Sequence, residues 1–154
     1  MDMDFVEGIR CIVPKYKESS ESLSKKVLNT LFLLREIDES LFTEWYEQGN
    51  SKKEALNLKL SLDIDSIEKI VLKEWDKKFP DLGSNFIFWS GKNNDLENTN
   101  ISFRIGLLSQ NKNLNNRVVI SFPMAIRIRK NDERINRISI ALSQIWRTKE
   151  IEVL

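Results

Sequence analysis

The sequence contains no histidine, and this absence excludes several kinds of active site. A serine or cysteine nucleophile cannot be paired with an imidazole base, and a zinc site built from cysteine and histidine cannot form. The single cysteine, Cys11, cannot make an internal disulfide bond, which agrees with a cytoplasmic protein. Only carboxylate chemistry, lysine chemistry and oxygen-ligated metals remain open to this chain.

Glycine, proline and long apolar runs are also scarce. With 5 glycines and 3 prolines in 154 residues, a long disordered tail is not expected. No run approaches the ~18 consecutive apolar residues that a membrane span needs. The chain starts with Met1, Asp2, Met3 and Asp4, which is acidic where a signal peptide is basic, and no apolar segment follows. We therefore expect a cytoplasmic protein without membrane contact, folded as one domain over residues 1–154.

Two hydrophobic periods predict the secondary structure. Apolar residues at helical spacing predict a helix to about Ile37, a short one over 41–48 that stops at Gly49, and two more that begin near Asp65 and Asp132. Asp65 and Glu68 have capping-box spacing. Apolar and polar residues alternate in a way that predicts strands over 5–13, 86–89, 101–107 and 118–122.

These elements predict an α+β fold. We expect an antiparallel sheet of about four strands, with three or four helices packed mainly on one face. The first strand should join the three later ones, and the sequence does not say at which edge. Ser51 can cap a further short turn through Ala55 and Leu56.

An acidic stretch without any basic residue runs from Glu36 through Gln48. With its two aromatic side chains it could form a negative surface that binds a basic partner, because interfaces favour aromatic anchors and complementary charge. The alternative is a solvated helix face whose aromatic side chains lie in the core. The candidate binding residues are Glu36, Asp38, Glu39, Glu44, Trp45, Tyr46 and Glu47.

Charge is divided unevenly along the chain. Residues 1–50 contain ten acidic and six basic residues, a net charge of −4, whereas residues 104–149 contain two acidic and ten basic residues, a net charge of +8. The basic region could contact phosphates, which gives a nucleic-acid-associated or regulatory module as the alternative function. Because no nucleic-acid-binding motif, phosphate loop or stacking aromatic accompanies its densest part, a solvated surface is the simpler interpretation. That part comprises Arg127, Arg129, Lys130, Arg134 and Arg137.

Pairs of carboxylates do not identify an active site in this sequence. Asp63 and Asp65 are close together, as are Asp76 and Asp81, but neither pair has a supporting partner, and such spacing is common at helix caps. We expect no catalytic residue, no cofactor, no metal and no direct contact with nucleic acid. Four further side chains are expected to be buried or to pack in the core: Cys11, Trp75, Trp89 and Trp146.

Short motifs follow one another in a characteristic order, at residues 19–23 (SSESL), 34–38 (LREID), 42–49 (FTEWYEQG), 51–56 (SKKEAL), 88–91 (FWSG), 118–123 (VVISFP) and 146 (W). This order resembles the immunity protein 52 family, small intracellular proteins encoded beside bacterial polymorphic toxins. The resemblance spans essentially the whole chain, and the block over 45–56 is its most specific part. Members of this family usually continue well past the tryptophan of the last helix, whereas here Leu154 follows soon after Trp146. The resemblance therefore implies a short member. The structural landmarks of the resemblance are Trp45, Gly49, Trp89, Gly91, Pro123 and Trp146.

The resemblance implies that the protein binds and neutralises a cognate toxin, which would be a nuclease with a restriction-endonuclease-like domain. Neutralisation would be occlusion, without chemistry by the immunity protein, through an interface of about 800 Å² on each partner. Charge reasoning, and not the family motif, selects the acidic stretch as the contact surface. The sequence leaves the oligomeric state open.

Overall fold

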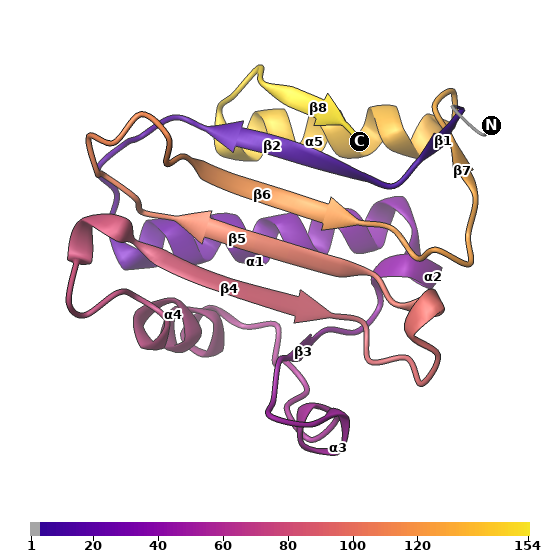
Figure 1. Cartoon of the computed structure of the whole chain (residues 1–154), viewed down its shortest axis with the longest axis horizontal. Helices are drawn as coiled ribbons and strands as arrows, with labels where there is room; N and C mark the ends of the chain where they lie inside the picture. Colours follow the sequence, from indigo (N-terminus) through magenta and orange to yellow (C-terminus); the bar gives the residue numbers. More distant parts are fainter. Residues whose placement is uncertain (1–3) are drawn as a thin grey trace.

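A computed structural model describes residues 4–154, which form a six-stranded antiparallel sheet with helices packed against it (Figure 1). In spatial order the strands are β3 (Tyr46–Glu47), β4 (Ser84–Trp89), β5 (Asn100–Ile105), β6 (Asn116–Ser121), β2 (Gly8–Val13) and β8 (Ile151–Val153). Every neighbouring pair is antiparallel. A separate two-stranded ladder joins β1 (Phe5–Val6) to β7 (Ile128–Arg129).

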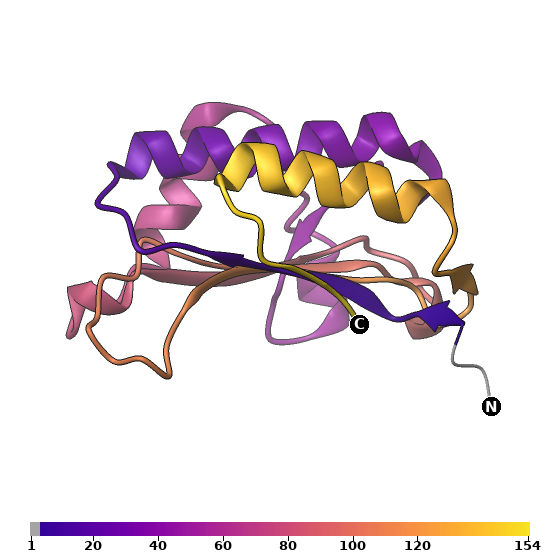
Figure 2. The same ribbon diagram turned by 90° about the horizontal axis from the view of Figure 1, so that it is seen from above.

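Three longer helices lie on one face of the sheet, as Figure 2 shows: α1 (Ser20–Ile37), α4 (Ile64–Lys73) and α5 (Glu133–Trp146). The connections contain two one-turn helices, α2 (Glu39–Phe42) and α3 (Lys52–Ala55), and two 3-10 turns, η1 (Pro80–Leu82) and η2 (Asp95–Glu97). The three longer helices leave the opposite face of the sheet uncovered. Within residues 4–154, no helix is long and apolar enough to cross a membrane.

Alternation along the strands builds the core. In β5, Ile101, Phe103 and Ile105 face the helices and are at most 1% exposed, while Ser102 and Arg104 lie on the other face. The Phe103 ring lies 6.2 Å from the Trp146 ring of α5. Burial of each such side chain contributes about 1.5–3 kcal/mol, so the helix-facing residues of the central strands hold the two layers together.

The predicted α+β class, the antiparallel sheet and the placement of helices on one face are confirmed, but the sheet is larger than expected. Three of the predicted strands correspond to β4, β5 and β6. The strand predicted over 5–13 is divided into β1, which pairs with β7, and β2, which joins the sheet beside β6. The strands β3 and β8 extend the sheet at its two edges. They have only two and three residues, too few for a period of two to be visible in the sequence.

Two local predictions are wrong. The helix expected over 41–48 ends at Phe42. Tyr46 lies in an extended strand instead, because its backbone pairs with β4. Gly49 therefore ends no helix. The cap of α4 is Asp63 and not Asp65. Glu68 does not complete a capping box but accepts a hydrogen bond from the Ser20 hydroxyl at 3.1 Å, which joins α4 to α1.

Candidate functional site

The segment from α2 to residue 60 forms the β3 edge of the sheet and carries the most distinctive sequence of the chain. Two backbone hydrogen bonds hold it in a narrow loop: the Leu60 N–H donates to the Trp45 carbonyl at 2.8 Å, and the Glu47 N–H donates to the Leu58 carbonyl at 3.0 Å. Ser51 caps α3 by accepting the Glu54 N–H at 3.1 Å, as predicted. The segment thus folds back on itself beside β4.

Trp45 does not lie on the surface, so its assignment as a binding anchor is wrong. Its side chain is 1% exposed and stacks on Phe42 with 6.2 Å between ring centroids. The indole N–H has no hydrogen-bond partner among residues 4–154. Of the two predicted aromatic anchors, only Tyr46 remains partly accessible, and its hydroxyl donates to Glu44 at 3.1 Å.

Two carboxylates near the end of the acidic stretch are already paired with lysines that lie further along the chain. Glu44 contacts Lys59 at 3.2 Å and Glu47 contacts Lys73 at 2.8 Å. Hydrogen bonds from Lys59 and then Tyr46 lower the pKa of Glu44. The hydrogen bond to Glu47 raises the pKa of Lys73. These contacts neutralise much of the charge that the sequence places in one run.

Asp38 connects the acidic stretch to the basic one. Its carboxylate accepts the Leu41 N–H as the cap of α2 and contacts the Arg134 guanidinium at 2.7 Å. Partial burial raises the pKa of Asp38, but hydrogen bonds from Ser40, Arg134 and the Leu41 N–H outweigh this effect, so the pKa lies below its ordinary value. Arg134 also holds Asp132 at 2.8 Å. The side chain of Arg134 is therefore committed to the fold.

Glu36 and Glu39 are the exposed carboxylates of the stretch that form no ion pair with any residue of 4–154. They lie on either side of Asp38, at the end of α1 and the start of α2. The candidate acidic surface thus reduces to this corner, with Glu44 and Tyr46 further along the chain.

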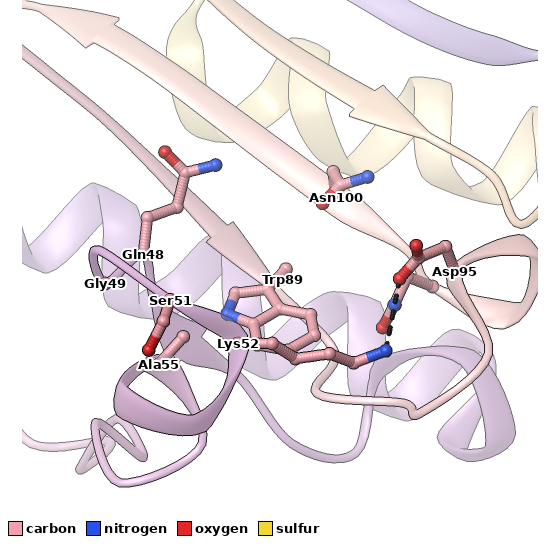
Figure 3. Close-up of a pocket in the computed structure, with 9 residues that line it drawn as sticks. Gln48, Gly49, Ser51, Lys52, Ala55, Trp89, Asp95 and Asn100 are labelled. Atoms are coloured by element: carbon pink, nitrogen blue, oxygen red, sulfur yellow. Dashed lines mark hydrogen bonds and ion pairs between the residues drawn. The ribbon is translucent and has the colours of Figure 1, made fainter.

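A polar pocket of about 550 Å³ lies between the α3 segment and β4 (Figure 3). Lys52 reaches across it to the Asn93 carbonyl and to Asp95, at 3.3 Å from the carboxylate. Trp89 and Asn100 form the part of the wall that belongs to the sheet. The ammonium of Lys52 is engaged by these contacts, and the Ser51 hydroxyl oxygen accepts the Glu54 N–H as the cap of α3.

The landmark residues of the family resemblance contribute to the packing of the protein or to the course of its backbone. A Cβ on Gly91 would lie 2.4 Å from the Tyr46 ring, and the backbone there has a φ of 74°. A Cβ on Gly49 would lie 2.8 Å from the Ala55 nitrogen. Pro123 and Trp146 are buried. Trp89 is half-buried and donates its indole N–H to the Glu47 carbonyl at 3.2 Å. None of these residues forms part of the exposed acidic corner.

The basic stretch is not one continuous patch. Arg127 and Arg129 lie over the Phe5 ring, 5.3 and 5.6 Å from its centroid, so they share one side of their extended segment as predicted. Arg134 instead points to Asp38 and Asp132. Lys130 and Arg137 are exposed.

Cys11 lies in the middle of β2 and is fully buried, as predicted. Burial raises the pKa of its thiol to about 12, so the thiolate is not formed at neutral pH. Asp63 and Asp76 are both occupied as acceptors of backbone N–H groups. No group of three or more histidine, cysteine, aspartate or glutamate side chains in the described part of the chain could hold a metal ion.

Sequence reasoning missed the uncovered face of the sheet as a possible binding surface. Arg104, Arg117 and Arg10 lie there, on three neighbouring strands. The sequence did contain an indication of this surface, because Arg104 and Arg117 occupy polar positions in two strands along which apolar and polar residues alternate. Their proximity depends on the register of β5 with β6, which the alternation alone does not fix.

Compared with known proteins, the chain matches no protein-family model and no curated protein.

Proposed function

We propose that this protein is an immunity protein, which binds and neutralises a cognate bacterial toxin. The toxin would be a nuclease with a restriction-endonuclease-like domain, and the protein would act by occlusion and not as an enzyme. The observation that carries the proposal is the exposed acidic corner formed by Glu36 and Glu39, in a chain whose motif order resembles the immunity protein 52 family. A nuclease presents a basic surface to its substrate, and unpaired carboxylates complement such a surface.

The stability of the corner supports this use. Asp38 lies between the two glutamates and is tied to Arg134, so the turn from α1 into α2 is held in place. A fixed backbone lowers the entropy cost of docking. Glu36 and Glu39 can then be presented without prior rearrangement.

Two potential nucleophiles, Cys11 and Lys52, are poorly placed for catalysis, which supports the proposal of binding. The Cys11 thiol is buried with a pKa of about 12, and Lys52 is engaged with Asp95. Inhibition would then require only a complex that covers the toxin's substrate path, for which an interface of about 800 Å² on each partner is sufficient.

The charge of the corner can be tested by reversal. Glu36→Lys with Glu39→Lys should weaken protection against the toxin encoded beside this protein, measured as survival on co-expression and as inhibition of nucleic-acid cleavage. The matched control is Glu97→Lys with Glu150→Lys, which makes the same change in net charge at exposed sites elsewhere. Equal protection by both double variants would remove the corner from the contact surface.

The second candidate function is a nucleic-acid-associated or regulatory module that uses the basic region. It is favoured by Arg127 and Arg129, whose guanidinium groups share the Phe5 ring. Binding of oligonucleotides, followed by fluorescence anisotropy, would then weaken steeply with added salt. A salt-independent signal, or none, would eliminate this candidate.

A further inference from the structure

The face of the sheet that the helices leave uncovered carries its side chains in rows across the strands, and Figure 1 looks onto this face. The strand registers define three rows. The first consists of Asn85, Arg104, Arg117 and Ile12. The second consists of Ile87, Ser102, Val119, Arg10 and Glu152. The third consists of Tyr46, Trp89, Asn100, Ser121 and Gly8.

Two arginines stand directly opposite each other in the first row. Arg104 of β5 is registered with Arg117 of β6, and both are half-buried. Side chains at directly opposed positions have their Cβ atoms roughly 5 Å apart, and like charges at such positions repel. The centre of the uncovered face therefore concentrates positive charge.

No carboxylate in residues 4–154 forms an ion pair with either arginine. Glu74 and Asp76 line a small cavity of about 230 Å³ together with Arg104, but both are otherwise engaged. Glu74 lies 3.9 Å from Lys73, and Asp76 accepts the backbone N–H groups of residues 78 and 79. The flanking residues of the first row, Asn85 and Ile12, carry no charge.

Arg10 in the second row, unlike Arg104 and Arg117, has a carboxylate partner. It faces Glu152 on the edge strand β8 and forms an ion pair with it. The three rows thus contain three arginines and one glutamate, a net charge of +2, and the glutamate is already engaged. A carboxylate supplied by a partner could pair with Arg104 and Arg117 as Glu152 pairs with Arg10 within the chain.

The surroundings of the arginine pair suit a protein better than a nucleic acid. Ile87 and Val119 adjoin it in the second row, and protein interfaces are enriched in arginine and have a more apolar core than the rest of the surface. The two aromatic side chains of the face, Trp89 and Tyr46, lie in the third row, whereas the arginine pair lies in the first. A net charge of +2 also offers little to a chain of phosphates.

We propose that the uncovered sheet face docks a protein segment that places an aspartate or glutamate carboxylate between Arg104 and Arg117 and apolar side chains over Ile87 and Val119. This surface is opposite in charge to the acidic corner, and the inference does not depend on the identity of a toxin. Bidentate contacts from arginine to carboxylate supply the specificity, and the aliphatic residues exclude water around them.

An NMR titration with model peptides tests the proposal. A capped peptide of alternating glutamate and valine is added at millimolar concentration to the full ¹⁵N-labelled chain. Expected are shifts of the amide resonances of 102–104 and 117–119 and of the Nε–H groups of the two arginines, with α1 unaffected. Arg104→Gln with Arg117→Gln should weaken binding about tenfold or more, the loss expected for charge-assisted hydrogen bonds.

Controls separate the proposal from general attraction of charge. Arg137→Gln with Lys149→Gln removes the same net charge from exposed sites elsewhere and should leave binding unchanged. A lysine–valine peptide should not shift the arginine resonances. The proposal is overturned if the glutamate–valine peptide produces no shifts, or shifts located elsewhere, in the unmodified chain. It is also overturned if single-stranded oligothymidylate binds this face more tightly than the peptide, because the face would then serve nucleic acid.

Discussion

The indole N–H of Trp146 donates to the Thr30 hydroxyl at 3.0 Å, and this hydrogen bond joins α5 to α1 inside the core. Trp45 is buried to the same degree, with 1% of its side chain exposed, but its indole N–H has no hydrogen-bond partner among residues 4–154. A buried donor without a partner costs about 1–3 kcal/mol. Equal burial therefore does not mean an equal contribution to stability.

We expect Trp146→Phe to destabilise the protein more than Trp45→Phe, by about 1 kcal/mol or more. Both changes replace a buried indole by a smaller phenyl ring. Trp146→Phe also breaks a hydrogen bond, whereas Trp45→Phe removes an unsatisfied donor. Chemical denaturation of the two variants measures the difference in the free energy of unfolding. A larger loss for Trp45→Phe would contradict this account of the two indoles.

The contact between Asp38 and Arg134 should make stability depend on pH. The pKa of Asp38 is lowered in the folded protein, so its contribution is present above the unfolded pKa and is lost as pH falls through the folded value. Asp38→Asn keeps a good helix cap but loses the charge. We expect a loss of about 1.5–3 kcal/mol at neutral pH and a smaller difference from the wild type in acid.

Asp63→Asn is the matched control for this prediction. Asp63 caps α4 in the same way, but it forms no ion pair with any residue of 4–154. Its replacement should cost less at neutral pH. Thermal unfolding of both variants from neutral pH down to below the ordinary aspartate pKa of about 3.9 gives the comparison. A gap between wild type and Asp38→Asn that stays constant over this whole range would refute the linkage.

Replacing one of the opposed arginines should stabilise the free protein. Arg117→Gln removes the repulsion with Arg104 and should add about 0.2–1 kcal/mol to the free energy of unfolding. Arg10→Gln on the same face should have the opposite sign, because it breaks the pair with Glu152, with a loss of up to about 1 kcal/mol. If Arg117→Gln proves destabilising in urea titrations, the two arginines do not repel each other appreciably.

Cys11 should be protected from thiol reagents in the native protein. It is fully buried on β2, between β6 and β8, and its pKa is raised to about 12, so both access and thiolate formation are suppressed. We expect labelling at neutral pH only as fast as the protein unfolds, with complete labelling in denaturant. Rapid modification under native conditions would show that β8 opens readily from the edge of the sheet.

The sequence predicted the parts of the fold that are determined locally. Alternation of Ile101, Phe103 and Ile105 with polar residues identified β5, because one face of that strand is buried and the other is not. The strand β3 was not predicted because Tyr46 and Glu47 are extended through pairing with β4, some forty residues later, and with residues 58–60. A local pattern cannot report such a contact.

The candidate site was less predictable than the fold. The acidic run over 36–48 suggested a continuous negative surface, yet Lys59, Lys73 and Arg134 are brought to it by tertiary structure. Trp45 has an acidic neighbour in sequence and still lies in the core. Local charge identified the segment, but the packing of α4 and α5 determined which carboxylates remain unpaired.

The central claim is that this protein inhibits a nuclease toxin by binding it. The most direct measurement is titration calorimetry of the purified protein with the nuclease domain of the proposed cognate toxin, paired with a cleavage assay at the same concentrations. We predict a one-to-one complex and loss of cleavage when this protein is present at a stoichiometric amount. Undiminished cleavage with no heat of binding would contradict it, whatever the uncovered sheet face binds.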